Sequence, residues 1–519
     1  MRLLVVRLFV IFLFLTFSKF INSQPAVSLK NSSYTYLKSN LEFLASNELE
    51  GREAASRGEK IAALFISEEL EKYGVIPYGD NGTYFQNFNM VIRKFTGESS
   101  VALKSKDNVR SILNGTDIAY SKRIYPDTNF SQKEYEIVFA GYGIVSEEDN
   151  YDSYKKIDVA NKVVAVINGT PKLKGKEILG DNALGKFGWR SSAKIDIAVE
   201  KGAVGLIILP DDMILRNWGY FSRWTTTPSF NLEEEVLNNL GEPNIPVLIF
   251  NEAASLELFN NEKTEYESIQ NSNPTNPDPF NLSKRIVMDY EVDKQVRISR
   301  NIIGLVKGND ESLSHEYVTL GAHYDHEGIR NGEIYYGADD NGSGTVTIME
   351  VARRLAEVKN NKRPVLIIFH TAEEKGLKGS KYLTQNAGFI DSIIVHLNFD
   401  MVGRKSEDSI YCIGASKISN ELGELIEEVN TRTSNMVLDY KFDDPTDPLR
   451  LYYRSDHYNY AKLGIPIAFF YDHMKVDYTK PTDTVEKINF NKLLRITDLA
   501  YNVIVELSNL KGELERNKK

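Results

Sequence analysis

Four short apolar runs between residues 317 and 403 each lead into a histidine or an acidic residue. They lie in YVTLGAHYDHEG (317–328), YYGADDNGSGTVTIME (335–350), VLIIFHTAEEKG (365–376) and VHLNFDMVG (395–403). Because ligands bind beyond the carboxyl ends of the strands in an open α/β sheet, we expect these side chains to converge on one point. Imidazole and carboxylate groups are the usual ligands of a borderline divalent cation such as zinc. The pattern therefore predicts a metal-dependent hydrolase.

The surrounding sequence indicates an α/β fold. From about residue 296, apolar strand-like runs alternate with segments of helical periodicity, which is typical of a mixed, largely parallel sheet flanked by helices. Nearer the N-terminus, apolar residues recur at helical spacing over 62–73, and Gly74 ends that helix. We expect a loop over 79–88 and a strand over 89–95.

The middle of the chain differs from the flanking segments in its sequence pattern and contains none of the seven histidines. Strand-like runs occur at 136–144, 162–169, 202–210 and 245–250, and a Pro- and Asn-rich stretch, 271–283, is typical of a linker. We therefore predict a catalytic domain built from 24–95 and 290–519, interrupted by an inserted β/α domain over 96–289.

Charge and the N-terminal residues limit the partners and the location. A net charge of −10 argues against nucleic acid or an anionic membrane surface as a partner. Two arginines precede a short apolar run and then polar residues, the order of a secretory signal peptide over 1–23. We expect an exported protein (periplasmic, cell-surface or extracellular) without stable membrane insertion after leader removal; an uncleaved anchor is the alternative. Cys412, the single cysteine, predicts a buried apolar residue.

The acidic and imidazole residues suggest a division of roles. His323 is the expected metal ligand, and Asp325, two residues later, is expected to orient its imidazole. Asp340, in the glycine-rich GADDNGSG, can bridge two cations, although an acidic residue there can also cap the following helix.

Two further segments complete the set. The adjacent glutamates Glu373 and Glu374 suggest one metal ligand and one general base, because successive side chains diverge in direction. Asp400, which ends an apolar strand, is a further candidate because a charged residue there needs a partner.

Taken in order and spacing, HYDHEG, GADDNGSG, TAEEKGLKGS and NFDMVGR resemble the di-zinc aminopeptidase family, which includes bacterial leucyl aminopeptidases and glutamate-carboxypeptidase-like enzymes. VFAGYGIV, KIDVANKVVAVINGTP and KGAVGLIIL resemble the protease-associated domain that many members carry as an insert. The resemblance implies an exopeptidase, most simply an aminopeptidase, that uses two zinc ions to cleave peptide or protein substrates. The residue roles that it implies are ligation by His323, Asp340 (bridging), Glu374 and Asp400, general base catalysis by Glu373, and orientation of the imidazole by Asp325.

One position departs from the family pattern. Members usually end in a DYHxPxDT-like stretch whose histidine completes the second metal site, but this chain reads DYTKPTDT, with Thr479 at that place. His473 can substitute, water can fill the place, or the protein can be partly or wholly inactive. We interpret His326 and His370 as hydrogen-bonded neighbours of the ligands and His457 as pocket lining or a further neighbour.

Two other functions remain open at this stage. A catalytically impaired binding protein on the same fold would explain Thr479. Glutaminyl-cyclase-like amide chemistry with one zinc would also fit a lost ligand, although the Asp339–Asp340 pair favours two metals. The pattern leaves the oligomeric state open.

Overall fold

The computed structural model divides the chain into two compact units, Met1–Met90 with Arg297–Lys519, and Val91–Val296. The predicted leader, 1–23, lies outside the described residues. The described ranges are 24–96, 100–121, 130–173, 176–177, 193–223, 227–238, 245–271, 277–404, 406–472 and 476–518.

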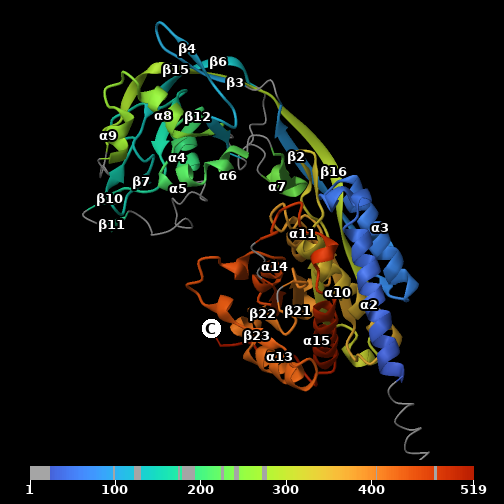
Figure 1. The fold of residues 1–519 in the computed structure, drawn as a ribbon. Helices are drawn as coiled ribbons and strands as arrows, with labels where there is room; N and C mark the ends of the chain where they lie inside the picture. Colours follow the sequence, from blue (N-terminus) through green and yellow to red (C-terminus); the bar gives the residue numbers. More distant parts are fainter. Residues whose placement is uncertain are drawn as a thin grey trace, which may run out of the picture. The chain divides into compact units, whose positions relative to one another are not determined.

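The discontinuous unit is built on a mixed sheet in which the strands run in the order β2-β16-β20-β17-β21-β24-β22-β23 (Figure 1). Strands β20, β17, β21 and β24 are mutually parallel, whereas β16 pairs antiparallel with β20, and β22 with β24. This confirms the predicted mixed, largely parallel sheet. The bounds are β2 (Phe85–Phe95), β16 (Val292–Val306), β20 (Val365–His370), β17 (Tyr317–His323), β21 (Ile393–Asp400), β24 (Ile467–Tyr471), β22 (Ser409–Ile413) and β23 (Val437–Asp439).

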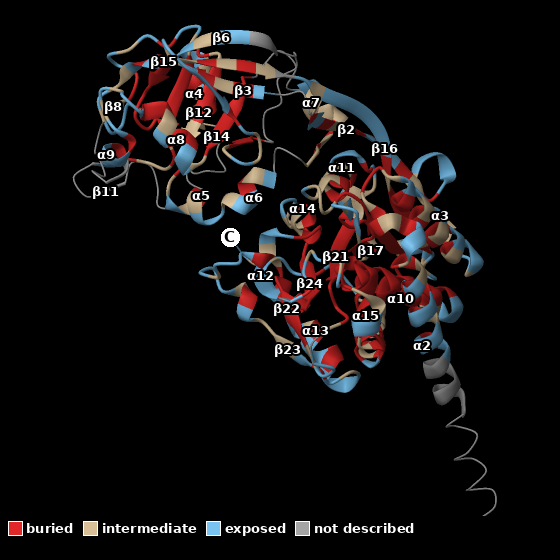
Figure 2. Ribbon diagram, turned by 45° about the horizontal axis from the view of Figure 1, so that its top comes forward, coloured by how far each residue is buried: buried red, intermediate tan, exposed pale blue. Residues whose placement is uncertain are grey.

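Helices cover both faces of this sheet because its central strands are apolar on both sides (Figure 2). Ile367 of β20 packs into one core and its neighbour Ile368 into another. The first core also receives side chains of α2, α3, α10, α13 and α15, and the second receives those of α11 and α14. The helices are α2 (Gln24–Leu44), α3 (Arg57–Lys72), α10 (Gly344–Val358), α11 (Lys378–Asn386), α13 (Asn420–Arg432), α14 (His457–Ala461) and α15 (Phe490–Ser508).

Local signals explain where the first of these elements begin and end. The Ser56 side chain accepts a hydrogen bond from Glu59 N and caps α3, and Gly74, with a φ of 77°, follows its end. The predicted loop over 79–88 is wrong at its second half, because β2 already begins at Phe85. Strand pairing outweighs the turn-like composition there, because β2 lies beside β16 in the sheet. The side chains of the two strands also interact: Asn301 of β16 donates a hydrogen bond from Nδ2 to Gln86 Oε1 at 2.9 Å.

The second unit has its own sheet and core. Its strands run in the order β4-β3-β15-β6-β9-β12-β14-β5, with β6, β9, β12 and β14 parallel. The strand-like runs predicted at 136–144, 162–169, 202–210 and 245–250 correspond to these four parallel strands. The bounds are β4 (Val109–Ile112), β3 (Ser100–Lys104), β15 (Phe280–Tyr290), β6 (Phe130–Phe139), β9 (Val163–Ile167), β12 (Gly205–Leu209), β14 (Val247–Phe250) and β5 (Ile118–Tyr120).

A buried lysine stabilises the end of β9 in this unit. Lys194, at the start of α4 (Ala193–Glu200), donates hydrogen bonds from Nζ to the main-chain oxygens of Ile167 at 2.7 Å and Gly169 at 2.6 Å. The helix is thereby held against the carboxyl end of the strand.

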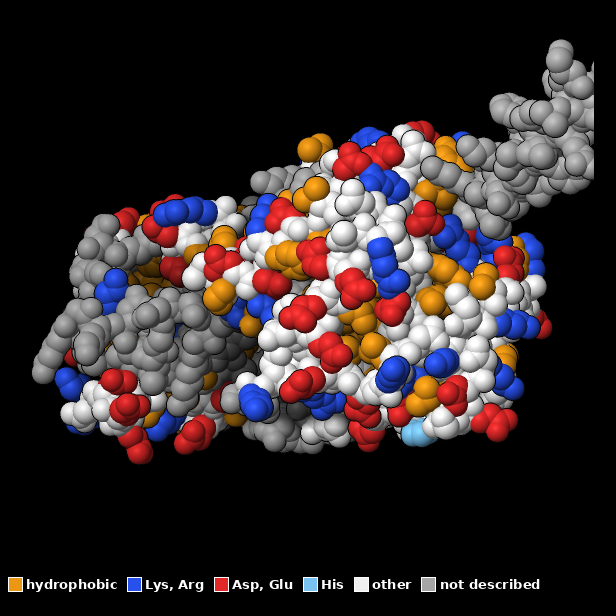
Figure 3. Space-filling view, turned by 90° about the horizontal axis from the view of Figure 1, so that it is seen from below, with side chains coloured by type: hydrophobic (Ala, Val, Ile, Leu, Met, Phe, Trp, Pro, Cys, Tyr) orange, Lys and Arg blue, Asp and Glu red, His pale blue; other side chains and the backbone are white. Residues whose placement is uncertain are grey.

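The surface carries charges of both signs. On the face drawn in Figure 3, Lys and Arg side chains are interspersed with Asp and Glu rather than separated by sign. Among the residues that the structure describes, no helix combines the length and apolar character needed to span a bilayer.

Candidate metal centre

The ends of two neighbouring strands bring the first group of candidate ligands together. His323 ends β17 and Asp400 ends β21, and because these strands pair in parallel their carboxyl ends lie side by side. His323 Nε2 lies 3.3 Å from Asp400 Oδ1 and 3.4 Å from Asp340 Oδ1. All three residues are buried. The Ser455 hydroxyl fixes the other carboxylate oxygen of Asp400, to which it donates at 2.8 Å.

A tightly held turn presents Asp340 to this group. The turn spans Ala338–Ser343, and Asp340 itself has a φ of −101°, outside the helical range. Asp483 accepts hydrogen bonds from the main-chain nitrogens of Asp339 and Asp340 at 3.0 Å. Asn341 joins the turn to β21, because its side chain donates to Phe399 O at 2.9 Å. The main chain of the turn is therefore fixed on both sides of Asp340.

A second group of candidate ligands shares Asp340. His326 and Glu374 lie beside it, with one ligand atom from each of the three residues within 4.8 Å of the others. His326 Nδ1 and Glu374 Oε1 are 2.7 Å apart. The structure thus brings Asp340, Glu374, His323 and Asp400 together, and it adds His326, which the sequence suggested only as a neighbour.

Asp325 and Glu373 lie next to these two groups. Asp325 Oδ1 is 3.6 Å from His323 Nδ1 and accepts a hydrogen bond from Glu373 N at 3.1 Å. Asp325 thus contacts the ring nitrogen of His323 that faces away from the other ligands, and it also holds the main chain at Glu373. The Glu373 side chain lines the pocket described below.

The site concentrates acidic groups away from water. Burial raises the pKa of Asp340 well above its ordinary value, and the charge of Glu374 raises it further. Burial also raises the pKa of Glu374 to about 7. Burial lowers the pKa of His326 to about 3, and the positive charge of Arg52 acts in the same direction. A neutral imidazole beside crowded carboxylates is the state that a divalent cation stabilises.

Two observations suggest that these residues can bind divalent cations: they are imidazole and carboxylate groups, and several of their buried polar atoms have no hydrogen bond. Within the described part of the chain, both ring nitrogens of His326 and Oε1 of Glu374 lack a hydrogen-bond partner although they are buried. His326 Nδ1 and Glu374 Oε1 approach each other to 2.7 Å without forming a hydrogen bond, so these two potential donor atoms lie side by side. Buried polar atoms without a hydrogen bond are rare in folded proteins, and a bound ion is one explanation for them.

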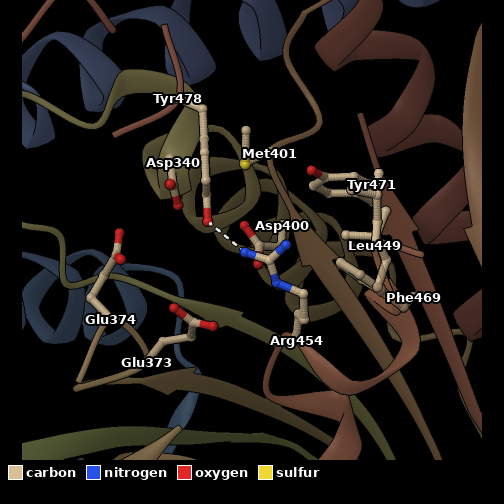
Figure 4. Close-up of a pocket in the computed structure, with 11 residues that line it drawn as sticks. Asp340, Glu373, Glu374, Asp400, Met401, Leu449, Arg454, Phe469, Tyr471 and Tyr478 are labelled. Atoms are coloured by element: carbon tan, nitrogen blue, oxygen red, sulfur yellow. Dashed lines mark hydrogen bonds between the residues drawn. The ribbon is translucent and has the colours of Figure 1, made fainter. Parts of the chain in front are cut away.

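A pocket of about 280 Å³ opens onto this site (Figure 4). Figure 4 shows the carboxylates of Glu373 and Glu374 on one side and the apolar side chains of Leu449 and Phe469 on the other. Arg454 lies between them and donates to the Tyr478 hydroxyl at 3.5 Å. The lining residues are Asp340, Glu373, Glu374, Asp400, Met401, Leu449, Leu451, Arg454, Phe469, Tyr471 and Tyr478.

Sequence reasoning missed a buried arginine beneath the site. Arg52 is 1% exposed, and its guanidinium donates to the carbonyl oxygens of Tyr324 at 2.8 Å, Tyr336 at 2.8 Å and Gly337 at 2.9 Å, and also to Leu44 O. It therefore ties together the main chain on both sides of the metal ligands. No sequence pattern around residue 52 distinguishes this arginine from an exposed one.

Three further histidines, His370, His396 and His457, lie outside both ligand groups. His370 hydrogen-bonds to the Tyr460 hydroxyl at 2.9 Å, and His396 hydrogen-bonds to the Thr319 hydroxyl at 2.8 Å. His457 Nε2 hydrogen-bonds to Tyr452 O at 2.8 Å. His473, the candidate substitute for the missing ligand, lies outside the described residues.

Comparison with sequence families identifies the segment that carries this site. Residues 301–504 match the model of peptidase family M28. Leucine aminopeptidase 2 of Trichophyton equinum is 28% identical over 242 residues, which cover 42% of this chain and 46% of that protein. Leucine aminopeptidase 1 of Fusarium vanettenii is 30% identical over 223 residues, which cover 40% and 55%. The chain thus matches about half the length of these curated relatives.

Comparison with solved structures extends the likeness to nearly the whole chain. An aminopeptidase from Aneurinibacillus sp. strain AM-1 superposes with a TM-score of 0.58 at 18% identity, covering 94% of this chain and 96% of that one. BSAP, a zinc aminopeptidase from Bacillus subtilis, superposes with a TM-score of 0.52 at 19% identity, covering 91% and 95%. These two superpositions show a shared fold.

Proposed function

We propose that the chain is a member of peptidase family M28, whose model matches residues 301–504, and that it is a metallo-aminopeptidase that releases N-terminal residues from peptides. One observation carries the proposal. Two groups of imidazole and carboxylate ligands share Asp340 at the base of a pocket that Glu373 also lines. The curated relatives and the solved neighbours are named as aminopeptidases, which supports the choice of reaction.

We assign the ligand roles from this geometry. His323, Asp400 and Asp340 would hold one cation, and Asp340 and Glu374 would hold a second, with Asp340 bridging. Zinc is the proposed metal, because the donors are imidazole and carboxylate and a structural neighbour is a zinc enzyme. When bound, such a pair activates water and polarises the peptide carbonyl.

The chain's own groups supply the proton transfer and the orientation. Glu373 would accept a proton from the attacking water on a carboxylate oxygen and deliver it to the departing amine nitrogen. Asp325 holds Glu373 in place through the hydrogen bond to its main-chain nitrogen, and the same carboxylate sets the orientation of His323.

The charge of the pocket supports action at the amino end of a peptide. Its lining includes Asp340, Glu373, Glu374 and Asp400, which attract a free α-ammonium group. The Met401, Leu451 and Phe469 side chains form an apolar wall that fits the side chain of the first residue. We also propose that the protein is exported and that its inserted unit is a protease-associated domain, as the sequence resemblance suggests.

The experiment is an assay on aminoacyl-chromophore substrates with and without a chelator. We expect hydrolysis that the chelator abolishes and added Zn²⁺ restores. Glu373→Gln should lower kcat by about 10²–10⁴-fold while the metal content stays unchanged, because the general base is lost and the ligands remain.

Glu53→Gln is the matched control and should keep full activity. Glu53 pairs with Lys375 and belongs neither to the pocket lining nor to either ligand group. If Glu373→Gln were as active as the parent, the assigned base would be wrong. Metal-loaded protein that hydrolyses no aminoacyl or peptide substrate would refute the enzyme assignment in favour of a binding protein.

A further inference from the structure

The second cation site lacks a nitrogen ligand if the family pattern is followed literally, because Thr479 stands where a histidine is expected. We propose that His326 supplies this ligand, so that the second site consists of His326, Asp340 and Glu374. The inference rests on the two-cation centre of the proposed function. The nitrogen ligand of the second site would then come from the loop that follows β17, and not from the segment around Thr479.

The position of His326 supports ligation. Its Nδ1 lies 2.7 Å from Glu374 Oε1, and the ligand atoms of His326, Asp340 and Glu374 lie within 4.8 Å of one another. Ligands of one zinc ion, at about 2.0–2.1 Å from the metal, necessarily stand within such distances of each other. His326 is fully buried, so its ring does not have water as an alternative partner.

A purely structural role would leave His326 poorly satisfied. Neither ring nitrogen has a hydrogen-bond partner among the described residues, whereas His370, His396 and His457 each hydrogen-bond through one nitrogen. A buried imidazole without a hydrogen bond costs about 1–3 kcal/mol. A bound cation would remove that cost, because it would give the imidazole a partner.

Contacts on two sides fix the position of His326. The main-chain nitrogen of His326 donates to Arg52 O at 3.1 Å, which fixes the residue at its backbone. On the other side, a Cβ at Gly337 would lie 2.5 Å from His326 Cγ, so only glycine leaves room for the ring. Gly337 also has a φ of 58°, which glycine adopts without strain. The ring is thus held at its place beside Glu374.

Thr479 is unsuited to the same role. A neutral hydroxyl is a weak zinc ligand beside imidazole and carboxylate. Its neighbour Tyr478 instead lines the pocket, where its hydroxyl meets Arg454. With His326 as the ligand, both imidazoles of the metal centre come from one short stretch, 323–326. The segment around 478 then contributes to the pocket lining and not to metal binding.

The test is the number of Zn²⁺ ions bound per chain, measured by mass spectrometry and by titration of the metal-free full-length protein. We expect two ions for the parent and one for His326→Asn, with binding to the second site about 100-fold weaker or worse. His396→Gln is the matched control, because His396 is equally buried but hydrogen-bonds to Thr319; it should keep two ions. His473→Asn should also keep two ions.

Two ions in His326→Asn would overturn the proposal, as would the loss of one ion in His473→Asn but not in His326→Asn. A second measurement avoids dependence on variant folding: anomalous diffraction at the zinc edge from crystals of the parent. A second peak about 2.0–2.1 Å from a His326 nitrogen supports the inference, and a second peak away from His326 refutes it.

These outcomes are separate from the aminopeptidase test. The parent could bind two ions, with His326→Asn binding one, and hydrolyse nothing; the ligand assignment would then stand and the function would fail. If the parent were an active aminopeptidase and His326→Asn still bound two ions, the proposed function would stand and the ligand assignment would fail.

Discussion

Replacing Arg52 by methionine tests whether one buried cation holds the metal centre together. Methionine keeps much of the apolar volume of the arginine stem but removes every donor. Four main-chain oxygens, those of Leu44, Tyr324, Tyr336 and Gly337, would then be buried without this partner.

The expected loss can be estimated from those bonds. A hydrogen bond to a charged group contributes about 1.5–3 kcal/mol, and the contributions of four bonds to one group are not additive. Each carbonyl oxygen left buried without its partner costs about 1–3 kcal/mol, so we expect Arg52→Met to lower the free energy of unfolding of this unit by about 4 kcal/mol. Arg52→Lys keeps the charge and three donors without the planar fork, and it should lose about half as much.

The assay must report the discontinuous unit alone. All three tryptophans lie between residues 189 and 224, in the other unit, so fluorescence is unsuited to this measurement. Hydrogen exchange of the α10 amides, measured on metal-free protein, gives the free energy of unfolding of the core of the discontinuous unit. Arg432→Met is the control, because its pair with Glu506 is half-exposed on both sides and is screened by water. A loss in Arg52→Met no larger than that of the control would refute the reasoning.

Three further predictions follow from the same structure. Chelation should lower the stability of α10 in the exchange assay by about 4 kcal/mol relative to Zn²⁺ held 1,000-fold above its Kd; identical exchange would contradict a metal bound to the folded state. Gly337→Ala should lower the Zn²⁺ content, because its Cβ would lie 2.2 Å from Asp340 O and 2.5 Å from His326 Cγ; a content of two per chain would show that the loop accommodates it. Burial lowers the pKa of Lys194 to about 7 from 10.5, so between these values the unfolded chain binds more protons and stability rises with pH, by up to about 1.4 kcal/mol per unit. Lys194→Met should remove that rise when unfolding by urea is followed by tryptophan fluorescence at pH 7.5 and 9.5; an unchanged slope would contradict it.

The fold was predictable where the signals are local. The apolar runs at 317–323, 365–370 and 395–400 became parallel strands because runs this short and apolar fit only a sheet covered on both faces. The helix after GADDNGSG also follows from periodicity. Residues 85–88 were mistaken for a loop because their place in β2 depends on pairing with β16, which lies more than 200 residues later in the chain.

The convergence of His323 and Asp400 was predictable for a different reason. A parallel sheet places the ends of neighbouring strands together whatever the intervening sequence. Arg52 and the role of His326 were not predictable in this way, since both depend on how loops turn in three dimensions. The sequence suggested that His326 was a hydrogen-bonded neighbour, but only the coordinates show that its nitrogens have no such partner among the described residues.

The discontinuity of the metal-binding unit has a consequence for its biogenesis. Leu41 of α2 and Ile66 of α3 share one core with Leu355 and Leu493, so the first helices cannot cover their apolar faces until the C-terminal half has been made. The intervening unit takes roughly tens of seconds to synthesise at about 5–20 residues per second, and it has a core of its own in which to fold meanwhile. A nascent chain of this protein therefore exposes the apolar faces of α2 and α3 for that whole interval.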